Sequence, residues 1–226
     1  MYFYDSSFII LIPAIIIAAW AQFKVSSTFG KYSKVSSING YTGAEAARML
    51  LDYNGLNNVP IELIDGRLTD HYDPGKRVMR LSKDIFYGSS VASIGVAAHE
   101  TGHAVQHKNH YAPLEIRNSI VPAVNFSSNA SWVIIIIGFL FRSGFLVNIG
   151  IILFSAVVIF QLVTLPVEFN ASKRAVNMLE ERGILCESEI KGARSVLSAA
   201  ALTYVAAALT AISQLIRLIL INKSND

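Results

Sequence analysis

The sequence predicts a mainly α-helical integral membrane protein with about four transmembrane helices. Of its 226 residues, 53% are hydrophobic and only 15% are charged, whereas a soluble domain carries about 25% charged residues. The deficit is concentrated in four stretches that lack Asp, Glu, Lys and Arg. Each is near the ~20 residues that a helix needs to cross the hydrocarbon core of a bilayer. These stretches are residues 6–23, 118–141, 143–167 and 195–216.

Each stretch is interpreted as one membrane-spanning helix. The second and third contain runs of large apolar residues, at 132–137 and 149–154. The fourth, which we extend to residue 221, is rich in alanine and less hydrophobic, so we expect it to pack inside the helix bundle. Residues 19–21 resemble a signal-peptide cleavage site, but no Lys or Arg precedes the first apolar run. We therefore predict a retained anchor rather than a cleaved signal peptide.

The distribution of basic residues predicts the orientation in the membrane. Residues 24–117 hold 11 of the 19 Lys and Arg, and residues 168–194 hold five more, whereas the turn after the second span holds only Arg142. Because cytoplasmic loops are enriched in Lys and Arg, both long segments are expected in the cytoplasm and the N-terminus outside. The net charge of +3 is accompanied by no basic stripe, so nucleic acid is not an expected partner.

The segment 24–117 is expected to form the larger part of a cytoplasmic core. A loop of this size is too small for a separate protease domain, so we predict a single domain, residues 1–226, that includes the membrane helices. Alternating hydrophobicity and turn residues predict its local structure. Its expected elements are a helix at 42–51 capped by Thr42, a strand at 59–64, a small β-hairpin of 68–72 and 77–81, and a helix at 89–108.

The most specific motif lies in the last of these helices and reads His99-Glu100-Thr101-Gly102-His103. Positions i and i+4 share one face of a helix, so the two imidazoles can reach one zinc ion, with Glu100 beside them to activate a bound water. Apart from Glu100, no charged residue occurs from Gly88 to His107, which predicts a buried helix. Gly102 leaves room for another element to approach closely. The pattern is typical of zinc metallopeptidases.

A catalytic zinc takes three protein ligands, so a third ligand is required. His107 lies further along the same helix and is rotated away, and we interpret it and His110 as interfacial polar residues. Glu168 stands at the cytoplasmic end of the third span, after Pro166, which favours a break or kink. We predict Glu168 as the third ligand, the alternative being a charge that marks the end of the span. Further acidic candidates are Glu115, Glu180, Glu181 and Glu187.

These motifs resemble those of gluzincin membrane peptidases. Glu168 follows the histidine motif by about 65 residues, similar to the HtpX and CAAX-prenyl-protease type, whose second motif is E-x-x-x-D. The segments L-T-D-H-Y-D-P at 68–74 and A-A-H-E-x-G-H-A-x-Q at 97–106 resemble more closely the YugP-like neutral zinc metallopeptidase family. The resemblance implies a gluzincin-like core that binds one Zn²⁺ per chain. It implies His99, His103 and Glu168 as zinc ligands and Glu100 as general base.

Two details of the implied site are left open. Ser172 stands where the HtpX type has an Asp that holds a ligand histidine, so this serine or another acid such as Asp73 would have to take that part. His71 and Tyr72, in the hairpin, are predicted catalytic residues that donate to the oxyanion, and Arg174 is a further candidate. The edge of the hairpin would also bind substrate backbone. The alternative interpretation of this segment is a polar turn.

The predicted function is a membrane-bound zinc endopeptidase that hydrolyses peptide bonds by Glu-assisted attack of a zinc-bound water, with its active site facing the cytoplasm. Its partners would be the bilayer and a protein or peptide substrate. One alternative is a site-2-type intramembrane protease, but no later span contains the Asp which that type uses. Another is a non-catalytic membrane scaffold with a structural zinc. Such sites usually have four ligands, often Cys, and the chain has a single cysteine, Cys186.

Overall fold

The computed structural model describes residues 6–225, which form two compact units. The span unit comprises the described part of Met1–Gln22 together with Glu115–Pro166 and Thr203–Asp226. The site unit comprises Phe23–Leu114 and Val167–Leu202. Because each unit is assembled from separate stretches of sequence, residues far apart along the chain meet within it.

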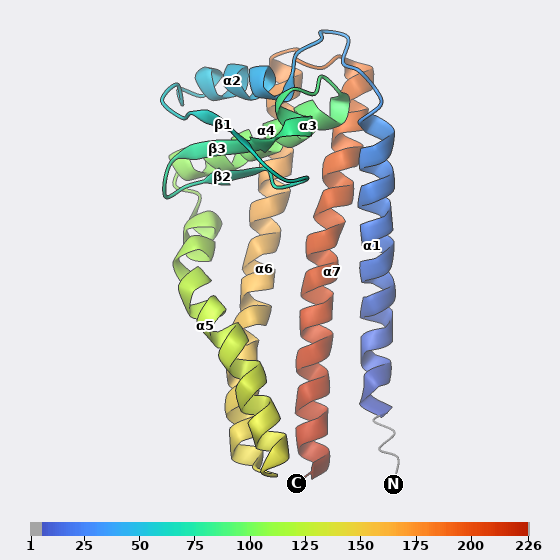
Figure 1. Cartoon of the computed structure of the whole chain (residues 1–226), viewed down its shortest axis with the longest axis vertical. Coiled ribbons are helices and arrows are strands. Elements are labelled where there is room, and N and C mark those ends of the chain that lie inside the picture. Colours follow the sequence, from blue (N-terminus) through green and yellow to red (C-terminus); the bar gives the residue numbers. More distant parts are fainter. Residues whose placement is uncertain (1–5, 226) are drawn as a thin grey trace. The chain divides into compact units, whose positions relative to one another are not determined.

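Four long helices account for most of the chain (Figure 1). They are α1 (Leu11–Tyr32), which follows a short 3₁₀ helix at Ser6–Ile10, α5 (Ala112–Leu140), α6 (Gly144–Glu181) and α7 (Glu187–Asn225). All four are long and apolar enough to cross a membrane. The prediction of four spans is therefore confirmed in the length and composition of the helices. The helices fit a multi-pass membrane protein.

The helices continue beyond the charge-free stretches that predicted them. α1 extends to Tyr32 and α6 to Glu181, and α7 already begins at Glu187. The segment 168–194 is consequently mostly helical and not an irregular loop. Of the predicted break or kink at Pro166, the break is wrong, because α6 runs through this residue without interruption. A proline removes only one backbone donor, and the bonds on either side of it maintain a long helix.

Three further helices belong to the site unit: α2 (Gly43–Tyr53), α3 (Lys83–Phe86) and α4 (Val91–Lys108). The predicted cap of α2 is confirmed, since Thr42 and Glu45 form a reciprocal capping box. The Ser90 hydroxyl accepts a hydrogen bond from the Ser93 amide and caps α4.

A three-stranded sheet has the order β1-β3-β2. Its strands are β1 (Ile61–Ile64), β2 (His71–Asp73) and β3 (Val78–Ser82). β2 and β3 pair antiparallel as the predicted hairpin, with Tyr72 opposite Met79. β1 pairs parallel with β3, and Ile61 lies opposite Met79. β2 is therefore an edge strand, open on the side away from β3.

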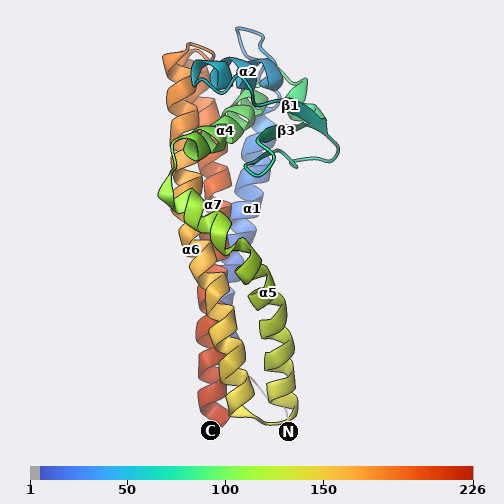
Figure 2. The ribbon, with the colours of Figure 1, turned by 90° about the vertical axis from the view of Figure 1, so that its left-hand side faces the viewer.

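α4 lies between two apolar clusters of the site unit. On one side, Ile94 packs in a cluster that includes Leu50 of α2 and Leu179 of α6. On another side, Ala97 joins a cluster that includes Met79 and Leu81 of β3. Figures 1 and 2 show α4 beside both the sheet and the end of α6 that belongs to this unit. This position fixes the orientation of the helix that carries the histidine motif.

The span unit has an apolar cluster of its own, formed by α5, α6 and α7. It contains Ile135, Phe154 and Leu218. Asn222 donates to the side-chain oxygen of Asn148 over 2.9 Å, which links α7 to α6. Amide pairs of this kind satisfy polar groups that hydrocarbon cannot.

Candidate metal centre

Two histidines of α4 and a glutamate of α6 converge on one point. His99 and His103 are one turn apart, and their rings meet edge to face with centroids 4.8 Å apart. The Nε2 atom of His99 lies 3.2 Å from Glu168 Oε2, and that of His103 lies 3.6 Å from the same oxygen. One donor atom from each residue falls within a group no wider than 4.8 Å. Among residues 6–225, this is the one such group of three found.

The spacing of these atoms fits a tetrahedral zinc site. Ligand atoms about 2.0–2.2 Å from zinc lie about 3.3–3.6 Å from one another in a tetrahedron. The observed nitrogen–oxygen distances of 3.2 and 3.6 Å lie just below this range and at its upper end. Glu168 is only 4% exposed, and a buried carboxylate requires a cation or hydrogen-bond donors. The donor set of two imidazoles and one carboxylate is one that zinc accepts, with a fourth position left for water or substrate.

The other ring nitrogen of each histidine is also engaged. Ser172 Oγ lies 3.1 Å from His99 Nδ1, so this serine occupies the position that the HtpX type gives to Asp. The alternative, Asp73, pairs instead with Arg80 over 3.1 Å. His103 Nδ1 lies 3.0 Å from Gln106 Oε1. With Nδ1 held by an oxygen, the Nε2 atom of each ring is left to face the Glu168 carboxylate, where it could bind a metal.

The tautomer of His103 follows from the bonds of Gln106, which is fully buried. The Gln106 Nε2 donates to Val167 O over 2.8 Å and to Asn170 Oδ1 over 3.0 Å. A carbonyl oxygen can only accept, so the amide nitrogen must face Val167 and Oε1 must face His103. His103 therefore donates from Nδ1, and its Nε2 keeps the lone pair that a metal needs. Arg174 Nε completes the chain by donating to Asn170 Oδ1 over 2.7 Å.

The sequence interpretation did not include this amide network. Gln106 lies three residues after His103 and thus on the same helical face, which was an available signal. The hydrogen bond from Gln106 to Asn170 depends on the packing of α6 against α4. No local pattern in the sequence indicates it. A close approach by another element was predicted at Gly102, and the structure shows that this element is α6. A Cβ there would lie 2.6 Å from the backbone oxygen of Ala171.

Glu100 is buried on α4 and faces the edge of the sheet. Its Oε2 accepts a hydrogen bond from the Tyr72 amide over 3.0 Å. Burial raises the pKa of the Glu100 carboxyl to about 7, with a smaller contribution in the same direction from the negative charges of Glu168 and Asp70. A carboxyl group in this range can both accept and release a proton near neutral pH.

The predicted hairpin residues lie on β2 with different contacts. The hydroxyl of Tyr72 shares a hydrogen bond of 2.9 Å with His107 Nδ1, and burial raises the pKa of the tyrosine. His107 is thus held by the hairpin. His71 Nδ1 lies 2.8 Å from Thr69 O, and its Nε2 lies 3.3 Å from Arg80 Nη1. The main-chain amide of Tyr72 thus contacts Glu100, whereas the His71 ring contacts Thr69 and Arg80 of the hairpin segment.

Other residues of the L-T-D-H-Y-D-P segment shape the hairpin. The Asp70 carboxylate accepts from the Ser82 amide over 2.7 Å, which ties the segment to the end of β3. Asp73 accepts from the amides of Gly75 and Lys76, each over 3.0 Å. These bonds lower the pKa of Asp73, the Lys76 amide having the largest effect. The segment therefore contains a polar turn and, next to it, the strand that contacts Glu100.

Comparison with known proteins identifies the family. A family model described as "Putative neutral zinc metallopeptidase" matches residues 7–223. The chain belongs to this family. It is also 53% identical over 210 residues to "Putative membrane protease YugP" of Bacillus subtilis (strain 168), and the match covers 93% of each chain. No solved structure matches the chain. The predicted resemblance to a YugP-like family is confirmed, and the family description implies zinc at a site such as His99, His103 and Glu168.

Proposed function

We propose that this chain is a membrane-bound zinc endopeptidase that hydrolyses peptide bonds by Glu-assisted attack of water. The observation that supports this most strongly is the convergence of His99 Nε2, His103 Nε2 and the buried Glu168 carboxylate, with Glu100 next to His99 on the same helix. The membership of a zinc metallopeptidase family supports the same conclusion.

His99, His103 and Glu168 would hold the zinc as its three protein ligands. Zinc bound there would polarise the peptide carbonyl and make water acidic enough to attack it near neutral pH. Ser172 and Gln106 hold the two rings through Nδ1, so little reorganisation is needed when the site is loaded.

Glu100 would act as the general base and then as the general acid. Its carboxylate takes a proton from water as the oxygen attacks the carbonyl carbon, and it passes this proton to the leaving nitrogen as the C–N bond breaks. Burial, which raises its pKa to about 7, suits both steps because neither protonation state is strongly disfavoured. The Tyr72 amide holds one carboxylate oxygen in place.

The substrate would lie along β2. This strand is at the edge of the sheet, and its Tyr72 amide faces Glu100, so an extended peptide could add beside it near the base. We assign Tyr72 as the first candidate for an oxyanion donor and His71 as the second. Tyr72→Phe should then lower turnover more than His71→Ala, since the ring of His71 contacts Thr69 and Arg80.

The active site would face the cytoplasm. Sixteen of the 19 Lys and Arg, 11 in residues 24–117 and five in residues 168–194, belong to the two segments that supply the candidate ligands and the sheet. This bias follows the positive-inside rule. Labelling of single cysteines by a membrane-impermeant reagent, one placed at Lys83 and one at Arg142 in a Cys186→Ser chain, would test the orientation. Labelling of the Lys83 position in intact cells would contradict it.

The decisive experiment measures zinc and cleavage in the same protein. Detergent-purified wild type should contain about one zinc per chain and should cleave unfolded casein. Glu168→Ala should lose the metal, whereas Glu100→Gln should retain it and lose cleavage. Metal-free wild type purified without chelators would contradict the zinc site. If wild type and Glu100→Gln both contain zinc, and Glu100→Gln leaves the cellular phenotype unchanged, the result would instead favour a membrane scaffold.

A further inference from the structure

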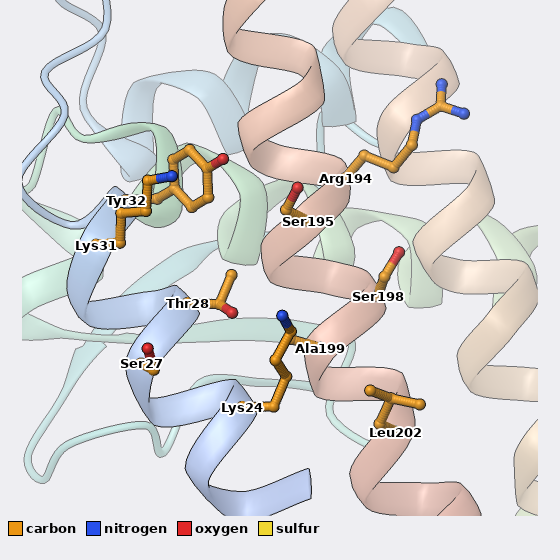
Figure 3. Close-up of a pocket in the computed structure, with 10 residues that line it drawn as sticks. All are labelled: Lys24, Ser27, Thr28, Lys31, Tyr32, Arg194, Ser195, Ser198, Ala199 and Leu202. Carbon is orange, nitrogen blue, oxygen red and sulfur yellow. The ribbon is translucent and has the colours of Figure 1, made fainter. Parts of the chain in front are cut away.

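A cavity of about 640 Å³ lies in the site unit, away from the residues of the metal centre. It is formed by the end of α1 and the beginning of α7, both within this unit. Figure 3 shows the side chains that line it. Three of them are cations, Lys24 and Lys31 from α1 and Arg194 from α7, and no Asp or Glu lines the cavity.

The three cations are exposed. Within the part of the chain that the structure describes, none of them forms an ion pair with a carboxylate. Lys31 instead lies over the ring of Tyr32, with its Nζ 5.1 Å from the ring centroid. Three like charges around one cavity repel each other, and a bound anion would remove this repulsion.

Hydroxyl groups provide hydrogen-bond donors around the same cavity. Thr28 comes from α1 and Ser198 from α7, whereas the Ser195 hydroxyl already donates to Lys191 O over 2.7 Å. The Tyr32 ring packs closely on Gly192, where a Cβ would lie only 2.7 Å from it. Cations together with hydroxyl donors, without carboxylates, are what the oxygens of a phosphate group require.

The cavity lies where two charge-free stretches end. Lys24 is the first charged residue after the stretch 6–23, and Arg194 is the last before 195–216. Leu202 lines the cavity further along α7, inside that apolar stretch. In Figure 3 the side chain of Lys24 extends toward Thr28 and away from the level of Leu202. A lysine at a membrane boundary places its charge toward the polar side in this way.

We propose that this cavity binds the phosphate of an anionic phospholipid headgroup. The cations and hydroxyls would hold the phosphate, and the glycerol backbone would lie toward Leu202. The location favours a lipid over a soluble anion, because both helices enter their membrane-length apolar stretches at this level. Basic pockets between membrane helices recognise anionic headgroups by the same combination of charge and position.

The test is a titration of the full-length protein in a non-ionic detergent, followed by native mass spectrometry. Short-chain phosphatidylglycerol should bind at least tenfold more tightly than phosphatidylcholine of the same chain length. Each cation near an anionic headgroup contributes about fivefold to binding, so Lys24→Gln/Lys31→Gln/Arg194→Gln should weaken phosphatidylglycerol binding by about 100-fold. The matched control Lys34→Gln/Lys83→Gln/Lys191→Gln loses the same charge from exposed positions outside the cavity and should bind like wild type.

Three results would overturn the proposal. They are equal binding of the two lipids, equal loss in the control variant, and displacement of the lipid by inorganic phosphate at the same concentration, which would indicate a site for soluble anions. If the triple variant fails to fold, the three single variants carry the test, each with an expected fivefold loss. Thr28→Val keeps every charge and should lower the affinity for phosphatidylglycerol a few-fold. An unchanged affinity would mean that the Thr28 hydroxyl does not bind the phosphate.

Discussion

Helix α4 of the site unit and the four long helices are all poor in charge, but their side chains have different surroundings. In α4, 13 of 18 residues are buried. In the most apolar 18-residue window of each long helix, only 17–22% of the residues are buried within the protein. α4 consists largely of Ala, Gly, Ser and Val, whereas the long helices expose large side chains such as Ile16, Phe126 and Ile136. Low charge alone therefore does not distinguish a helix covered by protein from one covered by lipid.

The size of the apolar side chains makes the distinction. Small residues let other backbones approach α4, as Ala171 does at Gly102, and such contacts exclude solvent from Glu100 and Gln106. The large exposed residues of the long helices, such as Ile16 and Ile136, are suited to contact with acyl chains. The comparison predicts that substitutions in α4 act through packing and hydrogen bonds, whereas those on the exposed faces of the spans have small effects.

The largest effect is expected from the buried charge of α4. Glu100→Gln should lower peptide hydrolysis by about 10³-fold, because general acid–base catalysis contributes about 10²–10⁴-fold. Its thermal stability should be equal to or above that of wild type. The amide oxygen still accepts from the Tyr72 amide, and a buried charge is removed. Cleavage of casein and thermal unfolding of the same preparation provide the two readouts. A clear loss of stability would mean that the carboxylate serves the fold and not the chemistry.

A matched pair of isoleucines tests the comparison directly. Ile94 of α4 is 0% exposed and Ile136 of α5 is 62% exposed. Ile94→Ala should lower the free energy of unfolding by about 2–5 kcal/mol, since it leaves a cavity in a packed cluster. Ile136→Ala should lower it by less than about 1 kcal/mol, because its side chain contacts lipid whether or not the helices are packed. Equilibrium unfolding in mixed detergent micelles measures both. Equal losses would show that the span surface is also packed against protein.

The same contrast explains what the sequence could and could not predict. The spacing of His99 and His103 is local, and Glu168 is a lone acid at the end of an apolar stretch, so their meeting could be predicted. The hairpin and the cap at Thr42 are also local features. The ends of the long helices could not be located from the sequence. A stretch without charged residues indicates where the chain contacts hydrocarbon, but not where the helical hydrogen bonds begin and end. α6 accordingly continues well past the charge-free stretch to Glu181.

Contacts between elements distant in sequence were missed for a different reason. The parallel pairing of β1 with β3 and the bond from Gln106 to Asn170 depend on tertiary packing. Neither leaves a periodic pattern in the chain. The sequence shows that Ser172 replaces the Asp of the HtpX type. Only the packing of α6 against α4, however, brings the Ser172 hydroxyl to His99.

A smaller effect is expected from the amide network. Gln106→Leu keeps the volume of the side chain but leaves His103 Nδ1 and the Val167 carbonyl without their present partner. Loss of a partner that orients a metal ligand weakens metal binding by about 10–100-fold, so zinc affinity should fall by that factor. Competition with a zinc-binding fluorescent chelator measures it. Asn129→Leu in the span unit, where the exposed amide donates to Asn125 O of its own helix over 3.0 Å, should leave zinc affinity unchanged.

The smallest effect is expected at Ser172, and it sharpens the account of how α6 supports α4. Ser172→Ala removes a neutral partner of His99 Nδ1, so zinc affinity should fall by about tenfold, at the low end of the range for such partners. Ser172→Asp should raise the affinity above that of wild type, because a charge-assisted bond to Nδ1 makes the imidazole a stronger ligand. The same chelator competition ranks the three proteins. An order in which the aspartate variant is weakest would mean that the serine is required by its size, since Ala171 already packs against Gly102 beside it.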